Sequence, residues 1–246
     1  MFVDVHAHLD FPDFENDLAE LLSQCKKQAI STIIVNGVDP ASNRKILALS
    51  NTYPLIKPAF GFYPTHIEEE SDEVIDQELQ WIEANKPLAI GEVGLDKKEP
   101  KNFERQVFYF KKIILLAKKM NIPLIVHSRK AERETIDLLT ELHAKKVVMH
   151  CFSGKKSLYK EIIEQGWSFS IPSLVSRVEQ FQQLVMATPT NQLLTETDSP
   201  FLSPTKDERN SPLTIPQAVA VIAGLKKMDT TSMEELIFQN FQRLFL

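Results

Sequence analysis

Eight short apolar segments, separated by longer segments with helical spacing, constrain the fold more than any other feature of the chain. Most of them are nearly continuous in apolar character, which is typical of parallel strands buried on both faces. The candidate strands are FVDV at 2–5, STIIVN at 31–36, IKPAF at 56–60, PLAIG at 87–91, PLIVH at 123–127, KVVMH at 146–150, WSFSI at 167–171 and QLLTE at 192–196. The repeated strand–helix order predicts an α/β fold with a parallel sheet.

The helical segments support this interpretation. The clearest are FENDLAELLSQCKKQA from Phe14, VIDQELQWIEAN from Val74 and FERQVFYFKKIILLAKKM from Phe103, with Asp39-Pro40 and Ser211-Pro212 as turn or helix-start signals and further helices from Leu213. No GxGxxG or GKS/GKT loop favours a doubly wound sheet. Eight βα units in 246 residues therefore predict a single (β/α)₈ TIM-barrel domain over residues 1–246.

Charge and cysteine content exclude some classes of protein. The formal net charge of −5 argues against a protein that coats duplex nucleic acid by charge alone. The two cysteines, Cys25 and Cys151, form neither a disulfide framework nor a CxxC pair, which favours a reducing compartment. The first ten residues lack the pattern of a signal peptide, and no apolar segment approaches the roughly 20 residues of a membrane span. We expect a cytoplasmic protein that does not bind membranes.

Ionisable residues gather at the carboxyl ends of the candidate strands, where TIM-barrel enzymes carry their reactive groups. Five of the six histidines fall there, and His143, in the helical segment before 146–150, is the exception. One strand-end histidine alone would be read as structural, but this convergence is not expected of scattered surface residues. The residues at this face are His6, His8, His66, Glu92, His127, His150 and Asp198.

These side chains form a mixed nitrogen and oxygen ligand set, which suits zinc or manganese, with magnesium as a further candidate. In His6-Ala7-His8 the two rings lie on the same side of an extended chain. Six ligands, His6, His8, Glu92, His127, His150 and Asp198, are too many for one tetrahedral ion. They suit two divalent ions that share a carboxylate, and Glu92, from a central strand, is the expected bridge. Asp10 is interpreted as an outer or rim group.

Other residues near this face have candidate roles in phosphodiester hydrolysis. Asp198 is the expected general base, with Glu92 and His66 as further catalytic residues, and Glu196 supports a ligand or has a structural role. Arg129 and Arg209 are candidate phosphate contacts, although each is equally consistent with a solvated loop arginine. Phe62, Tyr63 and Phe201 either stack on unpaired bases or pack at the barrel rim.

Ordered motifs along the whole chain resemble those of the TatD-related DNases, metal-dependent nucleases in the amidohydrolase superfamily of (β/α)₈ barrels. The motifs are VDVHAHLDF, GFYPTH, IGEVGLD, PLIVHSR, VVMHCFSG, LLTETDSPFLSP and RNSPLTIPQAVAVIA. The resemblance implies one metal on His6, His8, Glu92 and Asp198, and a second on Glu92, His127 and His150. It also implies that His66 contacts substrate. The chain departs from the family at Lys97, where an aromatic residue is common, and at Tyr63, where histidine is frequent.

The residues and the resemblance together predict a metal-dependent deoxyribonuclease, acting as an exonuclease on single strands or DNA ends. Two alternatives stay open at this point: a hydrolase of another ester or amide, and a metal-binding barrel without chemistry. The expected partner is DNA, and the expected state is a monomer or weak homo-oligomer.

Overall fold

The computed structural model describes residues 1–246, which form one eight-stranded parallel sheet in the order β1 to β8. The strands are β1 (Phe2–Ala7), β2 (Ile30–Asn36), β3 (Ile56–Phe60), β4 (Ala89–Gly94), β5 (Leu124–His127), β6 (Val147–His150), β7 (Ser168–Pro172) and β8 (Leu193–Glu196). β1 also lies beside β8, where a parallel bridge joins Ala7 to Ser199. The sheet therefore forms a nearly closed ring, and the predicted (β/α)₈ barrel is confirmed.

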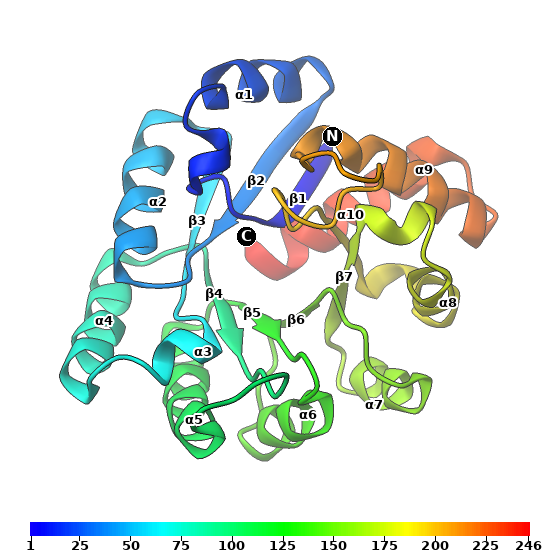
Figure 1. Cartoon of the computed structure of the whole chain (residues 1–246). Coiled ribbons are helices and arrows are strands. Elements are labelled where there is room, and N and C mark those ends of the chain that lie inside the picture. The colour runs from blue at the N-terminus through cyan, green and yellow to red at the C-terminus, as the bar shows by residue number, and fades with distance from the viewer.

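Helices surround the strands, as Figure 1 shows. They are α1 (Leu18–Lys27), α2 (Pro40–Thr52), α3 (Pro64–Ile67), α4 (Asp72–Asn85), α5 (Phe103–Met120), α6 (Glu132–Glu141), α7 (Tyr159–Glu164), α8 (Glu179–Ala187), α9 (Ile215–Lys226) and α10 (Thr230–Phe245). Short 3₁₀ turns cover Pro12–Phe14, Lys156–Leu158, Ser173–Ser176, Thr190–Gln192 and Pro212–Thr214. No helix is long and apolar enough to cross a membrane.

Local sequence signals account for several helix ends. The Asp39 side chain accepts a hydrogen bond from the Ser42 amide at 2.8 Å, and Pro40 opens α2 with its preset backbone angle. The expected helix from Phe14 is shorter than predicted, since Pro12–Phe14 forms a separate 3₁₀ turn and α1 begins at Leu18. The expected range 103–120 coincides with α5.

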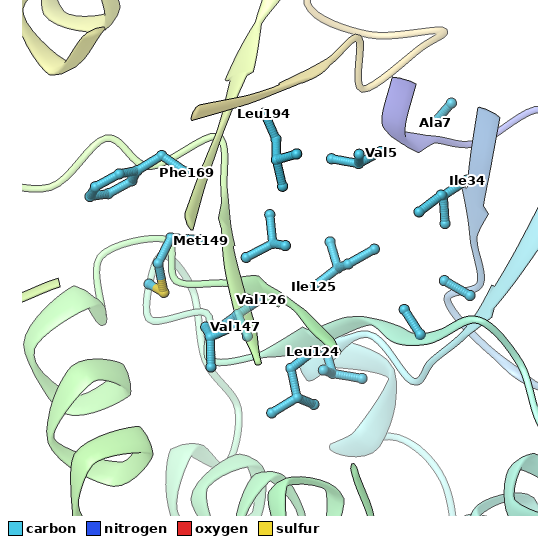
Figure 2. Packing of buried hydrophobic residues seen from close by; sticks show 14 of the residues in the cluster. Val5, Ala7, Ile34, Leu124, Ile125, Val126, Val147, Met149, Phe169 and Leu194 are labelled. Atoms are coloured by element: carbon cyan, nitrogen blue, oxygen red, sulfur yellow. The ribbon is translucent and has the colours of Figure 1, made fainter. Parts of the chain in front are cut away.

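The core is one cluster of 65 buried residues on both faces of the strands. In Figure 2, Val5, Ile125 and Leu194 lie inside the ring of strands, whereas Met149 and Phe169 point towards the helices. Every residue of β6 and β8 is buried. This two-sided burial is the reason for the nearly continuous apolar runs in the sequence.

Two strands extend further than their apolar runs. β1 continues to Ala7 and β4 to Gly94, so His6 and Glu92 lie within strands rather than after them. Gly94 adopts φ +142°, and a Cβ there would lie 2.0 Å from the His127 carbonyl oxygen. Glycine therefore lets β4 run close to β5, next to the ends of the strands that carry the candidate ligands.

Candidate metal centre

The six predicted ligands meet at the carboxyl-terminal end of the barrel. Each is fixed by the end of a strand or the turn that follows it: His6 and His8 by β1, Glu92 by β4, His127 by β5, His150 by β6 and Asp198 by β8. Between 3% and 6% of each of His8, Glu92 and His150 is exposed. The closing seam of the barrel positions Asp198, because its amide donates to the His6 carbonyl oxygen at 2.9 Å.

Four donor atoms form the first group: His6 Nε2, His8 Nε2, Glu92 Oε2 and Asp198 Oδ1. The two ring nitrogens are 3.1 Å apart, and they lie 3.3–3.5 Å from the two carboxylate oxygens. Ligands held ~2.0–2.1 Å from a tetrahedral ion lie ~3.3–3.4 Å from one another. The distances from both rings to each carboxylate are therefore close to those between ligands of one ion, and the donor atoms of His6, His8 and Asp198 all lie within 4.8 Å of one another.

A second group surrounds the other oxygen of Glu92. Glu92 Oε1 lies 2.8 Å from His127 Nδ1 and 3.8 Å from His150 Nε2. The His150 ring stacks on His6 at 3.7 Å between centroids, and the donor atoms of His6, Glu92 and His150 lie within 4.8 Å of one another. The two oxygens of Glu92 thus face two different histidine sets.

The charges of these buried groups depend on one another. Burial disfavours charge on Glu92, but hydrogen bonds from His127, His6 and His8 hold its pKa well below the usual range. Burial also opposes protonation of His127, yet hydrogen bonds to Asp96 and Glu92 raise its pKa to about 9. The buried carboxylates are thus stabilised by positive charge close to them. A divalent cation would supply such charge, because ligating histidines are neutral and ligating carboxylates are ionised.

A pocket of ≈ 440 Å³ opens above the ligands. It lies within the size range of small-ligand sites, ~300–1,000 Å³. Its lining consists of His8, Phe11, Val38, Tyr63, His66, Glu92, His127, Arg129, His150, Asp198, Phe201 and Leu202. The candidate ligands thus form the floor of a cavity that a substrate can enter.

Residues 3–246 match the family model described as TatD related DNase. The chain belongs to this family. Among its relatives, the human protein named deoxyribonuclease TATDN3 is 38% identical over 259 residues, which cover 99% of this chain and 94% of that protein. The prediction of a TatD-type metal-dependent hydrolase is confirmed at the level of the family.

Two further proteins extend the comparison of this TatD-family chain. The crystal structure of the Escherichia coli TatD homologue YjjV superposes with a TM-score of 0.92 at 27% identity, covering 99% of this chain and 97% of the other. The Erwinia tasmaniensis protein named 3'-5' ssDNA/RNA exonuclease TatD is 26% identical over 257 residues, which cover 98% of each chain.

The structure places the three predicted substrate contacts differently. His66, on α3, lines the pocket, and its Nδ1 lies 3.0 Å from the Val38 carbonyl oxygen. Arg129 also lines the pocket. Arg209 does not: its guanidinium pairs with the Asp17 carboxylate at 2.5 Å. This ion pair and the contact with Phe14 place the Arg209 side chain towards α1, outside the pocket lining, so its phosphate contact stays a prediction.

The three aromatic residues considered for base stacking also differ in position. Phe62 is fully buried in the core, so it cannot stack on a base, whereas Tyr63 and Phe201 line the pocket. Asp10 accepts a hydrogen bond from the Ser42 hydroxyl at 2.7 Å and lies outside the ligand groups. Glu196 Oε2 lies 2.8 Å from His150 Nδ1, as expected of a residue that orients a ligand.

Sequence reasoning missed Asp96, which joins one ligand to the pocket wall. Its Oδ2 accepts hydrogen bonds from His127 Nε2 at 3.1 Å, from the Tyr63 hydroxyl at 3.1 Å, and from Arg129 Nε and Nη2 at 2.9 and 2.6 Å. Burial opposes its ionisation, but the hydrogen bonds from His127, Arg129 and the Lys98 amide hold its pKa below the usual range. Its position two residues after β4, in the IGEVGLD motif, was the available signal.

We expect Asp96→Ala to weaken metal binding at the group of Glu92, His127 and His150 by ~10–100-fold, the usual cost of losing a carboxylate partner of a ligand. Asp96 holds His127 Nε2 and so keeps Nδ1 towards Glu92; without Asp96, the Tyr63 hydroxyl, 3.3 Å away, is the remaining partner of Nε2. Calorimetric titration with Mn²⁺ or Zn²⁺ measures this, and Asp96→Asn should recover part of the loss because its amide oxygen still accepts. Glu134→Gln, which removes the exposed partner of Lys97, is the control. Wild-type affinity in Asp96→Ala would contradict this role.

Proposed function

We propose that this chain is a divalent-metal-dependent deoxyribonuclease that hydrolyses phosphodiester bonds. The observation that carries the proposal is the placement of both oxygens of Glu92 between two histidine sets at the floor of an open pocket. Such a shared carboxylate suits two ions, the arrangement used for displacement at phosphorus. Membership of the TatD family and the names of the human and Erwinia relatives support DNA as the substrate.

We propose that two ions bind, one on His6, His8, Glu92 and Asp198 and the other on Glu92, His127 and His150, with Mg²⁺, Mn²⁺ or Zn²⁺ as candidates. When bound, such ions supply Lewis-acid activation of water and neutralise charge on the phosphoryl oxygens. The mixed nitrogen and oxygen donors favour zinc or manganese over magnesium.

The remaining roles fall to side chains that line the pocket. Asp198, with 16% of its side chain exposed, can accept the proton of the attacking water. Arg129 donates hydrogen bonds to Asp96 through Nε and Nη2. Its Nη1 has no acceptor in the protein and is available to bind a phosphate. His66 lies at the pocket edge with 39% of its side chain exposed, within reach of a bound substrate.

The preferred substrate in this proposal is a single strand or a DNA end, cleaved exonucleolytically. A pocket of ≈ 440 Å³ accommodates part of one strand rather than a duplex. The net charge of −5 gives no general attraction for duplex DNA, so recognition depends on the metals and on local cations such as Arg129.

The direct test is incubation of the metal-loaded protein with labelled single-stranded, blunt duplex and 3'- or 5'-overhang oligonucleotides, beside a panel of carboxylic esters and cyclic amides. We expect stepwise shortening of single strands and overhangs with Mg²⁺ or Mn²⁺, and none with EDTA. If an ester or amide is hydrolysed and no oligonucleotide is, the nuclease proposal is wrong and the chain is a hydrolase of the other class.

We also propose that residues 1–246 act as one catalytic domain, as a monomer or weak homo-oligomer in the cytoplasm. The barrel takes its strands and helices from the whole length of the chain. Both cysteines are free, which suits a reducing compartment. Light scattering coupled to size-exclusion chromatography measures the oligomeric state.

A further inference from the structure

An exposed aromatic ring stands at the mouth of the pocket. Phe201 is 52% exposed, and of the large apolar side chains that are exposed it is the one that lines the cavity above the metal ligands. It follows Asp198 by three residues in the loop after β8. Because it lies at the mouth of the pocket, this exposed ring is available for contact with whatever the pocket binds.

The loop that carries Phe201 is firmly held. The Phe201 amide donates to the Asp198 carbonyl oxygen at 2.8 Å, and the Asn210 amide donates to that of Pro200 at 3.0 Å. The side chain of Asn210, which is fully buried, donates to the carbonyl oxygens of Thr197 and Leu202. The ring is therefore presented by a fixed backbone, and its exposure is a property of the built site.

No protein ring stacks on Phe201. Phe11 meets it at an interplanar angle of 79° with centroids 6.0 Å apart, and His8 meets it at 64° and 6.4 Å. Phe11 itself stacks on His8, at 24° and 4.9 Å. The aromatic wall is thus anchored to a metal ligand through Phe11, while Phe201 has no parallel partner.

The facing wall is polar. Tyr63 and Arg129 come from the loops after β3 and β5, whereas Phe11 and Phe201 come from the loops after β1 and β8, on the other side of the barrel. Arg129 and Tyr63 are both held by Asp96, and the metal ligands lie between the two walls. One wall therefore suits a planar apolar group and the other an anion.

We propose that Phe201 is a stacking platform for the unpaired terminal base of the substrate strand, with the adjacent phosphate over the metal ligands and towards Arg129. This inference rests on the proposed function and adds how the site selects its substrate. A base inside a duplex is already stacked and paired, so only a frayed, overhanging or single-stranded end presents a free base. Stacking on an aromatic ring tolerates every base, so cleavage should depend little on sequence.

The test combines Phe201→Ala with oligonucleotides whose terminal residue is either a normal nucleotide or an abasic one, placed at each end in turn. Losing a base–aromatic stack lowers kcat/KM by about 5- to 150-fold. We expect Phe201→Ala to show this loss on the end with a normal base and little loss on the abasic end. Phe201→Tyr should behave as wild type, and Met186→Ala, at an exposed position on α8, is the matched control.

An equal loss on both ends would overturn the proposal, because damage to the loop would affect either substrate. A binding measurement separates this from failure of the proposed function: Phe201→Trp in an Asp198→Asn background, loaded with Mn²⁺, reports stacking by fluorescence quenching. Stronger quenching by the base-bearing oligonucleotide supports the platform even if the wild type cleaves no DNA. Equal or absent quenching by both overturns it even if the wild type is a nuclease.

Discussion

We expect Asp198→Asn to lower kcat by ~10²–10⁴-fold at saturating metal, the usual cost of removing a general base. The substitution keeps the size of the side chain and removes the proton acceptor. Burial opposes the charge of Asp198, but hydrogen bonds from His6 and His8 hold its pKa low, so the carboxylate is ionised at neutral pH. Its position at the pocket, against two ligand rings, allows it to reach the attacking water.

The measurement is kcat on a single-stranded oligonucleotide over a metal titration, since Asp198→Asn should also weaken one metal. Saturation restores occupancy and leaves the chemical step slow. Asp207→Asn, an exposed carboxylate in the same loop, should leave kcat unchanged. If Asp198→Asn has the wild-type kcat at saturating metal, Asp198 only binds metal and is not the general base. His66 would then be the next candidate for the base.

Glu92→Gln should weaken both metals together. In the wild type we expect about two equivalents of Mn²⁺ or Zn²⁺ per chain, because the two oxygens of Glu92 face two histidine sets. The amide keeps the shape but removes the negative charge that both ions share. The affinity for each metal should fall by more than the ~10–100-fold expected when only a hydrogen-bonding partner of a ligand is removed. Less than one equivalent of metal should then bind at concentrations that saturate the wild type.

Elemental analysis after metal loading and gel filtration measures the stoichiometry, and thermal unfolding verifies that the variant is folded. His127→Ala is the matched comparison, since it removes a ligand from one group only and should leave one equivalent bound. Retention of one metal at wild-type affinity in Glu92→Gln would rule out the shared carboxylate.

The sequence alone predicted the barrel and the six candidate ligands, because both follow from local patterns. Two-sided burial gives each strand a continuous apolar run, and parallel strands bring their carboxyl ends to one face. The ends of β1 and β4 were predicted too early, since hydrophobicity stops at His6 and Glu92 while backbone pairing continues. The ladder of hydrogen bonds does not depend on whether a side chain is polar.

Only the tertiary structure decided which loops meet. Arg209 pairs with Asp17, 192 positions away, and so is drawn away from the pocket where its sequence context placed it. Asp96, after β4, gathers Tyr63 from the connection after β3 and His127 and Arg129 from the end of β5 and the loop after it. The meeting of β1 and β8 brings the loops of Asp17 and Arg209 together, and the pairing of β3, β4 and β5 brings Asp96 to its partners; no local pattern records either. A residue's own sequence neighbours determine its strand or helix and the face it occupies, whereas its partners across the pocket depend on how the whole ring closes.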